Sequence, residues 1–224
     1  MPAVPFATVF GAARTRHGAA AIDARLPQPK SASELAATPD DRYLSQMSLR
    51  VFRAGLKHSL VDAKWPAFEE VFEGFDPRRV RAMSDEALEK LLGDVRLIRH
   101  WGKLKSIRDN AAATMTVSEE FGGFGAWLAT WPGSNVIGLW DALGERFSQM
   151  GGASGPMFLR MVGKDTFVLS KSVIAGLQRW AEMPNPPKNR ADRATAQACF
   201  NAWAAETGRP LSQLSLILAM SVDD

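Results

Sequence analysis

One strip of basic side chains could bind a phosphate or another anion. Helical spacing, at about 100° per residue, places it on the stretch 42–57, where it consists of Gln46, Arg50, Arg53 and Lys57. Spacing alone favours the plainer interpretation, in which these side chains form a solvated basic edge. The alternative is a wall that faces a phosphate or a substrate, and the residue types permit both.

A glycine-rich turn is a second candidate for phosphate binding. The sequence MGGASGP at 150–156 separates two helical patterns, and Pro156 suits the first turn of the helix that follows. Backbone N–H groups at a turn and at a helix N-terminus hold a phosphate without a charged side chain. The sequence therefore predicts a helix-hairpin-helix with backbone contacts from Gly151, Gly152, Ala153, Ser154 and Gly155. Arg160 and Lys164 could add contacts, although a solvated face explains them equally well.

The elements that must position these groups are helices. Residues 42–56 carry apolar side chains on two sides, which predicts a helix buried between neighbours, with Asp40 or Asp41 as its N-cap. The next helical pattern ends at FDP (75–77), because the residue before a proline is pushed out of the α region. Helical spacing covers most of the chain and strand alternation is absent, so the sequence predicts an all-α fold.

Other helices are marked by composition and by their caps. The Ala-rich residues 6–22 can form a helix, Ser31 or Ser33 caps a short one, and Ser84 begins another. The prolines of LPQPKS interrupt the first of these patterns. We therefore expect an N-terminal helical arm over 1–41 and the main domain over 42–224.

Composition excludes several classes of protein. The 224 residues are 46% hydrophobic, as in ordinary globular proteins, and 27 Lys and Arg residues only slightly exceed 24 Asp and Glu residues. This mild excess does not indicate a tail that coats nucleic acid. The single cysteine, Cys199, excludes an intrachain disulfide and fits a reducing compartment. No apolar run approaches the ~18 residues of a membrane span and no secretory signal is recognised, so we expect a cytoplasmic protein.

Three blocks of sequence together resemble one family. They are FRAGL at 52–56, AFEEVFEGFDP at 67–77 and LIRHWGKLKSIRDNA at 97–111, and their order and spacing match as well. On these blocks the chain is identified as a member of the bacterial 3-methyladenine DNA glycosylase I family, within the helix-hairpin-helix DNA glycosylase superfamily. The resemblance extends from about residue 43 to residue 180, and the ends diverge.

The resemblance implies a fold, an activity and a partner. The fold is all-α, with two packed helical subdomains and a cleft between them. The activity is hydrolysis of the N-glycosidic bond of alkylated purines such as 3-methyladenine in double-stranded DNA, as part of base excision repair. The target base leaves the stack and enters a pocket, to which the resemblance assigns Phe52, His58 and Arg50. We expect a monomer without a cofactor.

The chain departs from the family at the residues that carry its chemistry. By alignment on AGL (54–56), the family's active-site glutamate falls on Arg50 and its base-stacking tryptophan on His58. The catalytic aspartate of the wider superfamily falls near Ser170. With only Cys199 and three histidines, the chain cannot form the family's zinc site, so we expect no metal.

These departures leave the catalytic residue open. Substitute carboxylates could come from Asp62, Glu119 or Glu120, each of which is more often a solvated surface residue. One hypothesis is a DNA N-glycosylase in which pocket binding of an already labile base does much of the work. The second is a non-catalytic DNA- or lesion-binding relative that has lost its carboxylates. A third and weaker hypothesis is a scaffold for an unrelated small-molecule or protein partner.

Overall fold

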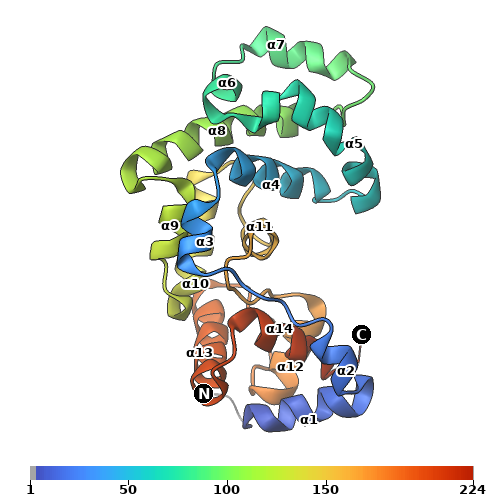
Figure 1. The fold of residues 1–224 in the computed structure, drawn as a ribbon. Helices are drawn as coiled ribbons and strands as arrows, with labels where there is room; N and C mark the ends of the chain where they lie inside the picture. The colour runs from blue at the N-terminus through green and yellow to red at the C-terminus, as the bar shows by residue number, and fades with distance from the viewer. Residues whose placement is uncertain (1–3, 224) are drawn as a thin grey trace. The chain divides into compact units, whose positions relative to one another are not determined.

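The regular structure of the chain is entirely helical. The computed structural model describes residues 4–223, and every regular element in that range is a helix (Figure 1). The expected all-α fold is thereby confirmed. Contacts group the residues into two compact units: unit 1 takes its described residues from 1–30, 132–139 and 163–224, and unit 2 consists of 31–131 and 140–162. The expected division at residue 41, and the expected cleft, stay predictions.

Unit 1 has its own aromatic core. Its elements are α1 (Phe6–His17), α2 (Ala19–Asp23), η3 (Gly133–Asn135), the first turn of α10 (Val136–Arg146), α12 (Lys171–Trp180), α13 (Arg190–Thr207) and α14 (Leu211–Met220). The ring of Phe167 stacks on that of Phe200 with their centroids 4.3 Å apart, and Phe200 meets Trp203 edge-on. The Asp165 carboxylate accepts the N–H groups of Leu211 and Ser212, each at 2.9 Å, so it satisfies free donors at the start of α14.

The Ala-rich stretch 6–22 forms two helices, although the sequence predicted one. Gly18 separates α1 from α2 at φ +77°, a backbone conformation that glycine adopts without the steric cost of a side chain. The missed signal was local, because a glycine within a run of alanines is a natural break.

Unit 2 contains the sequence blocks that carry the family resemblance. Its elements are α3 (Ala32–Ala37), α4 (Asp40–Arg53), α5 (His58–Val71), η1 (Glu73–Phe75), α6 (Pro77–Arg81), α7 (Asp85–Lys90), η2 (Leu91–Gly93), α8 (Trp101–Phe121), α9 (Phe124–Thr130), the rest of α10 and α11 (Ser154–Val162). In this unit α4 packs against α5, α8 and α11 (Figure 1). The helix that carries Gln46, Arg50 and Arg53 is therefore buried between neighbours, as its two apolar sides predicted. Lys57, the last member of the predicted strip, lies beyond the end of α4, at the N-cap of α5.

An aromatic cluster holds α4, α5 and η1 together. The ring of Trp65 stacks on Phe68 and Phe75, with centroids 4.9 Å and 5.4 Å away, and Phe52 meets Phe68 edge-on at 4.7 Å. Phe52, Phe68 and Phe75 are fully buried. Burying side chains of this size contributes about 1.5–3 kcal/mol each, so the cluster is a principal reason that α4 keeps its position.

Some helix ends follow the sequence signals and one does not. Ser31 and Ser84 cap α3 and α7 as predicted, each accepting a backbone N–H three residues on. The expected cap of α4 was wrong, because Asp40 lies inside the first turn after Pro39. Its carboxylate instead accepts the N–H of Phe124, at 2.9 Å, and so links the starts of α4 and α9.

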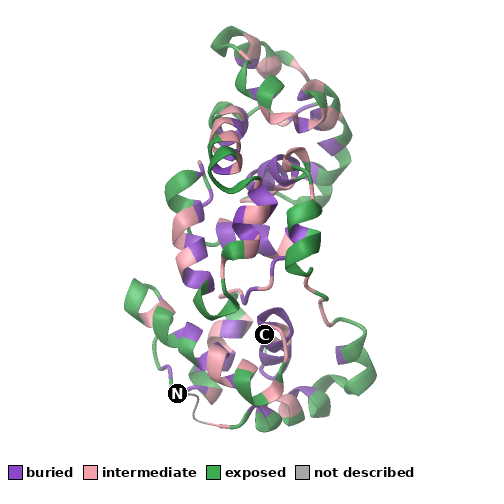
Figure 2. Ribbon diagram, turned by 60° about the vertical axis from the view of Figure 1, so that its left-hand side comes forward, coloured by how far each residue is buried: buried purple, intermediate pink, exposed green. Residues whose placement is uncertain are grey.

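Buried residues run along the inner sides of the helices in each unit, and the outer sides are exposed (Figure 2). Among residues 4–223, no helix is long and apolar enough to cross a membrane. Cys199 is buried and free.

Two backbones approach closely at Gly125 of α9. A Cβ at this position would lie 2.0 Å from the carbonyl oxygen of Leu35 and 3.0 Å from Cε2 of Tyr43. The same carbonyl accepts a hydrogen bond from the Tyr43 hydroxyl at 2.7 Å. Only glycine therefore lets α3 and α9 pack at this distance.

We expect Gly125→Ala to destabilise the fold by about 1–3 kcal/mol, because the added methyl overlaps a backbone atom. The measurement is the free energy of unfolding in urea. Gly102→Ala is the matched control, since its Cβ would meet only His100, at an ordinary 3.6 Å. Equal stability of the Gly125 and Gly102 variants would contradict the close packing of α3 on α9.

Candidate nucleic-acid interface

The C-terminal end of α4 is closed by a buried lysine from α8. Lys103 is 8% exposed, and its Nζ donates hydrogen bonds to the carbonyl oxygens of Ala54, at 2.7 Å, and Phe52, at 3.3 Å. The last carbonyls of a helix lack partners within the helix and form the negative end of its dipole, so an ammonium group stabilises them. Lys103 thus fixes the first turn of α8 against the end of α4.

Arg50, one turn before that end, has no acidic partner among residues 4–223. Its Nε is buried and makes no hydrogen bond in this range. Burial lowers the pKa of Arg50, and the neighbouring charge of Arg53 lowers it further. Burial also lowers the pKa of Lys103, with the charge of Arg50 as the second cause. Arg50 and Lys103 therefore lie close enough to repel one another.

Arg53, the next basic residue of the strip, differs from Arg50 because it is paired. Its Nη2 lies 2.8 Å from Oδ1 of Asp62 on α5, and its Nε donates to the same oxygen at 2.9 Å. Asp62 is the candidate acid that the structure places beside the strip, where its carboxylate is already held by Arg53. An exposed pair of this kind contributes at most about 1 kcal/mol to stability.

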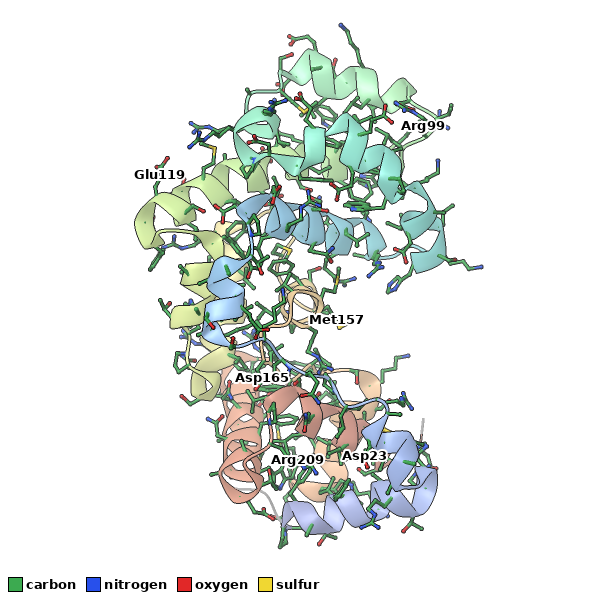
Figure 3. The ribbon with its side chains drawn as sticks, viewed as in Figure 1. Asp23, Arg99, Glu119, Met157, Asp165 and Arg209 are labelled. Atoms are coloured by element: carbon green, nitrogen blue, oxygen red, sulfur yellow. The ribbon has the colours of Figure 1, made fainter. Side chains whose placement is uncertain are left out.

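The other two candidate acids lie at the opposite end of α8. Glu119 is sixteen positions beyond Lys103, which at a rise of about 1.5 Å per residue separates their backbones by roughly 24 Å. Figure 3 shows Glu119 near one end of α8 and Arg99 near the other. Glu120 forms an ion pair with Arg146 at 2.8 Å. Neither carboxylate can reach Arg50 from that end of the helix.

The residues assigned to a base pocket are in different surroundings. Phe52 is fully buried in the aromatic cluster, so its ring supports α4 from behind and has no exposed area to offer a base. His58 is exposed at the first position of α5. Arg50 is half-buried. We retain His58 and Arg50 as candidates for contact with a ligand.

The glycine-rich turn forms the predicted hairpin. Residues 147–153 connect α10 to α11, which begins at Ser154 and has Pro156 in its first turn. Gly151, Gly152 and Ala153 are exposed, and Ser154 and Gly155 are progressively more buried. Gly152 adopts φ +59°, which favours glycine. The exposed part of the turn can thus bring backbone N–H groups to a phosphate.

A buried asparagine anchors this hairpin to α8. Asn110 is 1% exposed; its Nδ2 donates to the carbonyl oxygen of Ser148 at 3.1 Å, and its Oδ1 accepts the Ser148 N–H at 2.7 Å. Next along the turn, Gln149 donates through Nε2 to the carbonyl oxygen of Gly102 at 2.9 Å, and Met150 is fully buried. The start of the hairpin is therefore held by hydrogen bonds to two residues of α8, Asn110 and Gly102, and by the burial of Met150.

The same first turn of α8 contacts both phosphate-binding candidates. Gly102 accepts the bond from the hairpin, and Lys103, the next residue, caps α4 one turn beyond Arg50. The hairpin and the Arg50 end of α4 are consequently joined through two consecutive residues within unit 2.

Three further predicted site residues differ in their surroundings, and the DNA contacts predicted for two of them, Arg160 and Lys164, stay predictions. Arg160 is half-buried on α11, while Lys164 is 8% exposed, and burial lowers its pKa, so its ammonium group is not extended toward solvent. Ser170 is the N-cap of α12, where its hydroxyl accepts the N–H of Val173 at 3.2 Å. An aspartate would cap a helix equally well, so serine keeps the cap and lacks the carboxylate.

Sequence reasoning missed the roles of Asn110 and Lys103. Asn110 shares one face of α8 with Ile107, Ala111 and Thr114, all nearly or fully buried. A buried polar side chain requires a hydrogen-bond partner, so an asparagine on an apolar helix face was the available signal. Lys103 gave no comparable signal. In the described part of the chain, no cluster of His, Cys, Asp and Glu residues could hold a metal ion.

We expect Asn110→Ala to lower the stability of unit 2 by about 1–3 kcal/mol, because it leaves the N–H and C=O of Ser148 without their partner. Amide hydrogen exchange at Ser148 should become faster than in the wild type. Gln149→Ala is the comparison, since it removes one exposed bond and should change stability by less than about 0.5 kcal/mol. Unchanged exchange at Ser148 in the Asn110 variant would show that the hairpin is not anchored there.

Comparison with known proteins connects these features to one family. The model of the methyladenine glycosylase family matches residues 35–145. A curated relative, DNA-3-methyladenine glycosylase 1 of Escherichia coli (strain K12), is 33% identical over 82 residues, which are 37% of this chain and 44% of the relative. The chain thus aligns with less than half the length of that relative.

Solved structures agree with the fold. The 3-methyladenine DNA glycosylase I of Staphylococcus aureus is similar with a TM-score of 0.52 at 20% identity, over 62% of this chain and 80% of that one. The 8-oxoguanine glycosylase/lyase of Methanocaldococcus jannaschii, in complex with DNA containing 8-oxoguanine, has a TM-score of 0.52 at 14% identity, over 95% and 94%. The matched residues 35–145 include α4, the FDP turn and α8. The chain therefore belongs to the methyladenine glycosylase family, with a helix-hairpin-helix DNA glycosylase fold.

Proposed function

We propose that this protein is a DNA N-glycosylase of base excision repair that hydrolyses the N-glycosidic bond of alkylated purines such as 3-methyladenine. The family match over residues 35–145 carries the proposal, because those residues include the helix and blocks that define the resemblance. The hairpin supports binding to double-stranded DNA. We expect a monomer in the cytoplasm, and both remain predictions.

The proposed reaction needs little from the protein when the base is already cationic. The C1′–N bond breaks and the base leaves with the electron pair as a neutral purine. The oxygen of a water molecule then bonds to C1′ and releases a proton. The transition state carries positive charge on the sugar, so the contributions of the protein are to hold the extruded base and to place negative groups near the sugar.

Arg50 works against the second of these contributions, which is to place negative groups near the sugar. A half-buried cation at the position that the resemblance gives to a glutamate raises the energy of a positively charged sugar nearby. Asp62 does not compensate, because Arg53 holds its carboxylate. The protein should therefore work by binding and sequestering a labile base, and its substrates should be bases that leave readily.

The test is release of 3-methyladenine from methylated duplex DNA, measured by chromatography against a reaction without protein. We expect release above the uncatalysed rate. We also expect Arg50→Glu to raise the rate of release from fully bound DNA, measured with the protein in saturating excess, roughly tenfold or more, since one well-placed stabilising group is worth about 10²–10³ in kcat. Arg81→Glu, with the same charge change on the exposed end of α6, should leave it unchanged.

Two outcomes would change the assignment. If the rate of base release equals the rate without protein while the protein still binds DNA, a non-catalytic DNA- or lesion-binding relative is favoured. The Arg50→Glu variant would then show whether the carboxylate alone restores activity. Failure to bind duplex DNA at low salt would favour an unrelated partner for the scaffold.

A further inference from the structure

Two cations at the end of α4, Arg50 and Lys103, form no ion pair with a carboxylate among residues 4–223, whereas Arg53 is paired with Asp62. Arg50 has a buried Nε without a hydrogen-bond partner, and no ion pair holds its guanidinium within residues 4–223. Lys103 uses its ammonium group on neutral carbonyl oxygens. A buried donor without a partner costs about 1–3 kcal/mol, and a charged neighbour of the same sign adds to that cost.

We propose that Arg50 binds a backbone phosphate of the DNA strand that the hairpin also holds. A phosphate at the accessible part of this half-buried side chain offsets the repulsion between Arg50 and its neighbours Arg53 and Lys103. This inference rests on the DNA-binding part of the proposed function and does not require base excision. It assigns to the helix a strand-positioning role, where the family resemblance implies a carboxylate.

The chemistry of the side chain suits a phosphate. The guanidinium group is planar and can place two parallel N–H groups on two phosphate oxygens. A half-buried arginine is also held more firmly than a fully exposed one, so less side-chain freedom is lost on binding. A carboxylate from this chain could play the same part, but Asp62 is committed to Arg53, and Glu119 and Glu120 lie at the far end of α8.

The position of Arg50 suits a strand that passes the hairpin. Both sites are attached to the first turn of α8, the hairpin through Gln149 to Gly102 and the end of α4 through Lys103 to Ala54. All of these residues belong to unit 2. The spacing of the two proposed phosphate contacts is therefore set by helices that pack within this unit.

The favourable dipole at a helix C-terminus is the simplest competing explanation. Arg50 and Arg53 both lie in the last turn of α4, where a positive charge contributes about 0.3–1 kcal/mol. This explains a basic residue there but does not offset the repulsion between Arg50 and Lys103. The two explanations differ in what a change of charge does to DNA binding.

The experiment is binding of an unmodified duplex oligonucleotide, followed by fluorescence anisotropy over a range of salt concentrations. For each phosphate contact, the slope of log K against log salt is about −0.9 for duplex DNA. We expect Arg50→Ala to make the slope shallower by about 1 and to weaken binding at low salt about tenfold, as for the loss of a hydrogen bond to a charged group. Arg50→Lys should keep the slope and recover part of the affinity.

Arg81→Ala is the matched control, because it removes the same charge from an exposed position on α6 and should leave the slope unchanged. Circular dichroism of each variant confirms that it is folded. Equal slopes for the wild type and Arg50→Ala would overturn the inference, as would the absence of DNA binding by the wild type. A slope that depends on Arg50 in a protein that releases no base would overturn the proposed glycosylase activity and leave this inference standing.

Discussion

The hydrogen bonds of one lysine hold the candidate site together. Lys103 reaches from α8 to the final carbonyls of α4 and satisfies acceptors that the helix itself leaves free. Its Nζ also lies 5.8 Å from the centre of the Phe52 ring. The hairpin bonds to the preceding residue, Gly102, so the two parts of the interface meet at the first turn of α8. An exposed lysine could not act in this way, since it would lose too much side-chain freedom.

The charge at this junction also limits the chemistry. Placing a carboxylate beside Lys103 would relieve repulsion and stabilise a cationic sugar, whereas Arg50 does the opposite in both respects. A local excess of positive charge instead favours the polyanionic backbone of DNA. On the proposal made above, the glycosylase fold is thus combined with charges that bind the DNA strand and do not stabilise a cationic sugar.

The sequence predicted those features that depend on neighbouring residues. Helical periodicity, the caps at Ser31 and Ser84, and the hairpin at 150–156 are all decided within a few residues, and the structure contains them. The strip on α4 was also found, but which of its members would be paired was not.

The roles that were missed depend on residues far apart in the chain. Asp40 was expected to cap its own helix, yet its partner Phe124 is 84 positions away. Lys103 and Ala54 are 49 positions apart, and Asn110 and Ser148 are 38 apart. Such pairs form only when tertiary packing brings helices together. The apolar face around Asn110 indicated that this residue needs a partner, but nothing in the sequence identified Ser148 as that partner. Phe52 shows the same limit, because family resemblance placed it in the pocket and packing placed it in the core.

The cap of α12 has a consequence for how such a protein changes over time. Ser170 accepts the N–H of Val173, which is the same structural task that an aspartate would perform there. Exchange of one for the other alters the reactive groups of the protein while helix stability stays nearly constant. Selection for stable folding therefore does not distinguish serine from aspartate at position 170. A protein with this fold can gain or lose a carboxylate there without an unstable intermediate sequence.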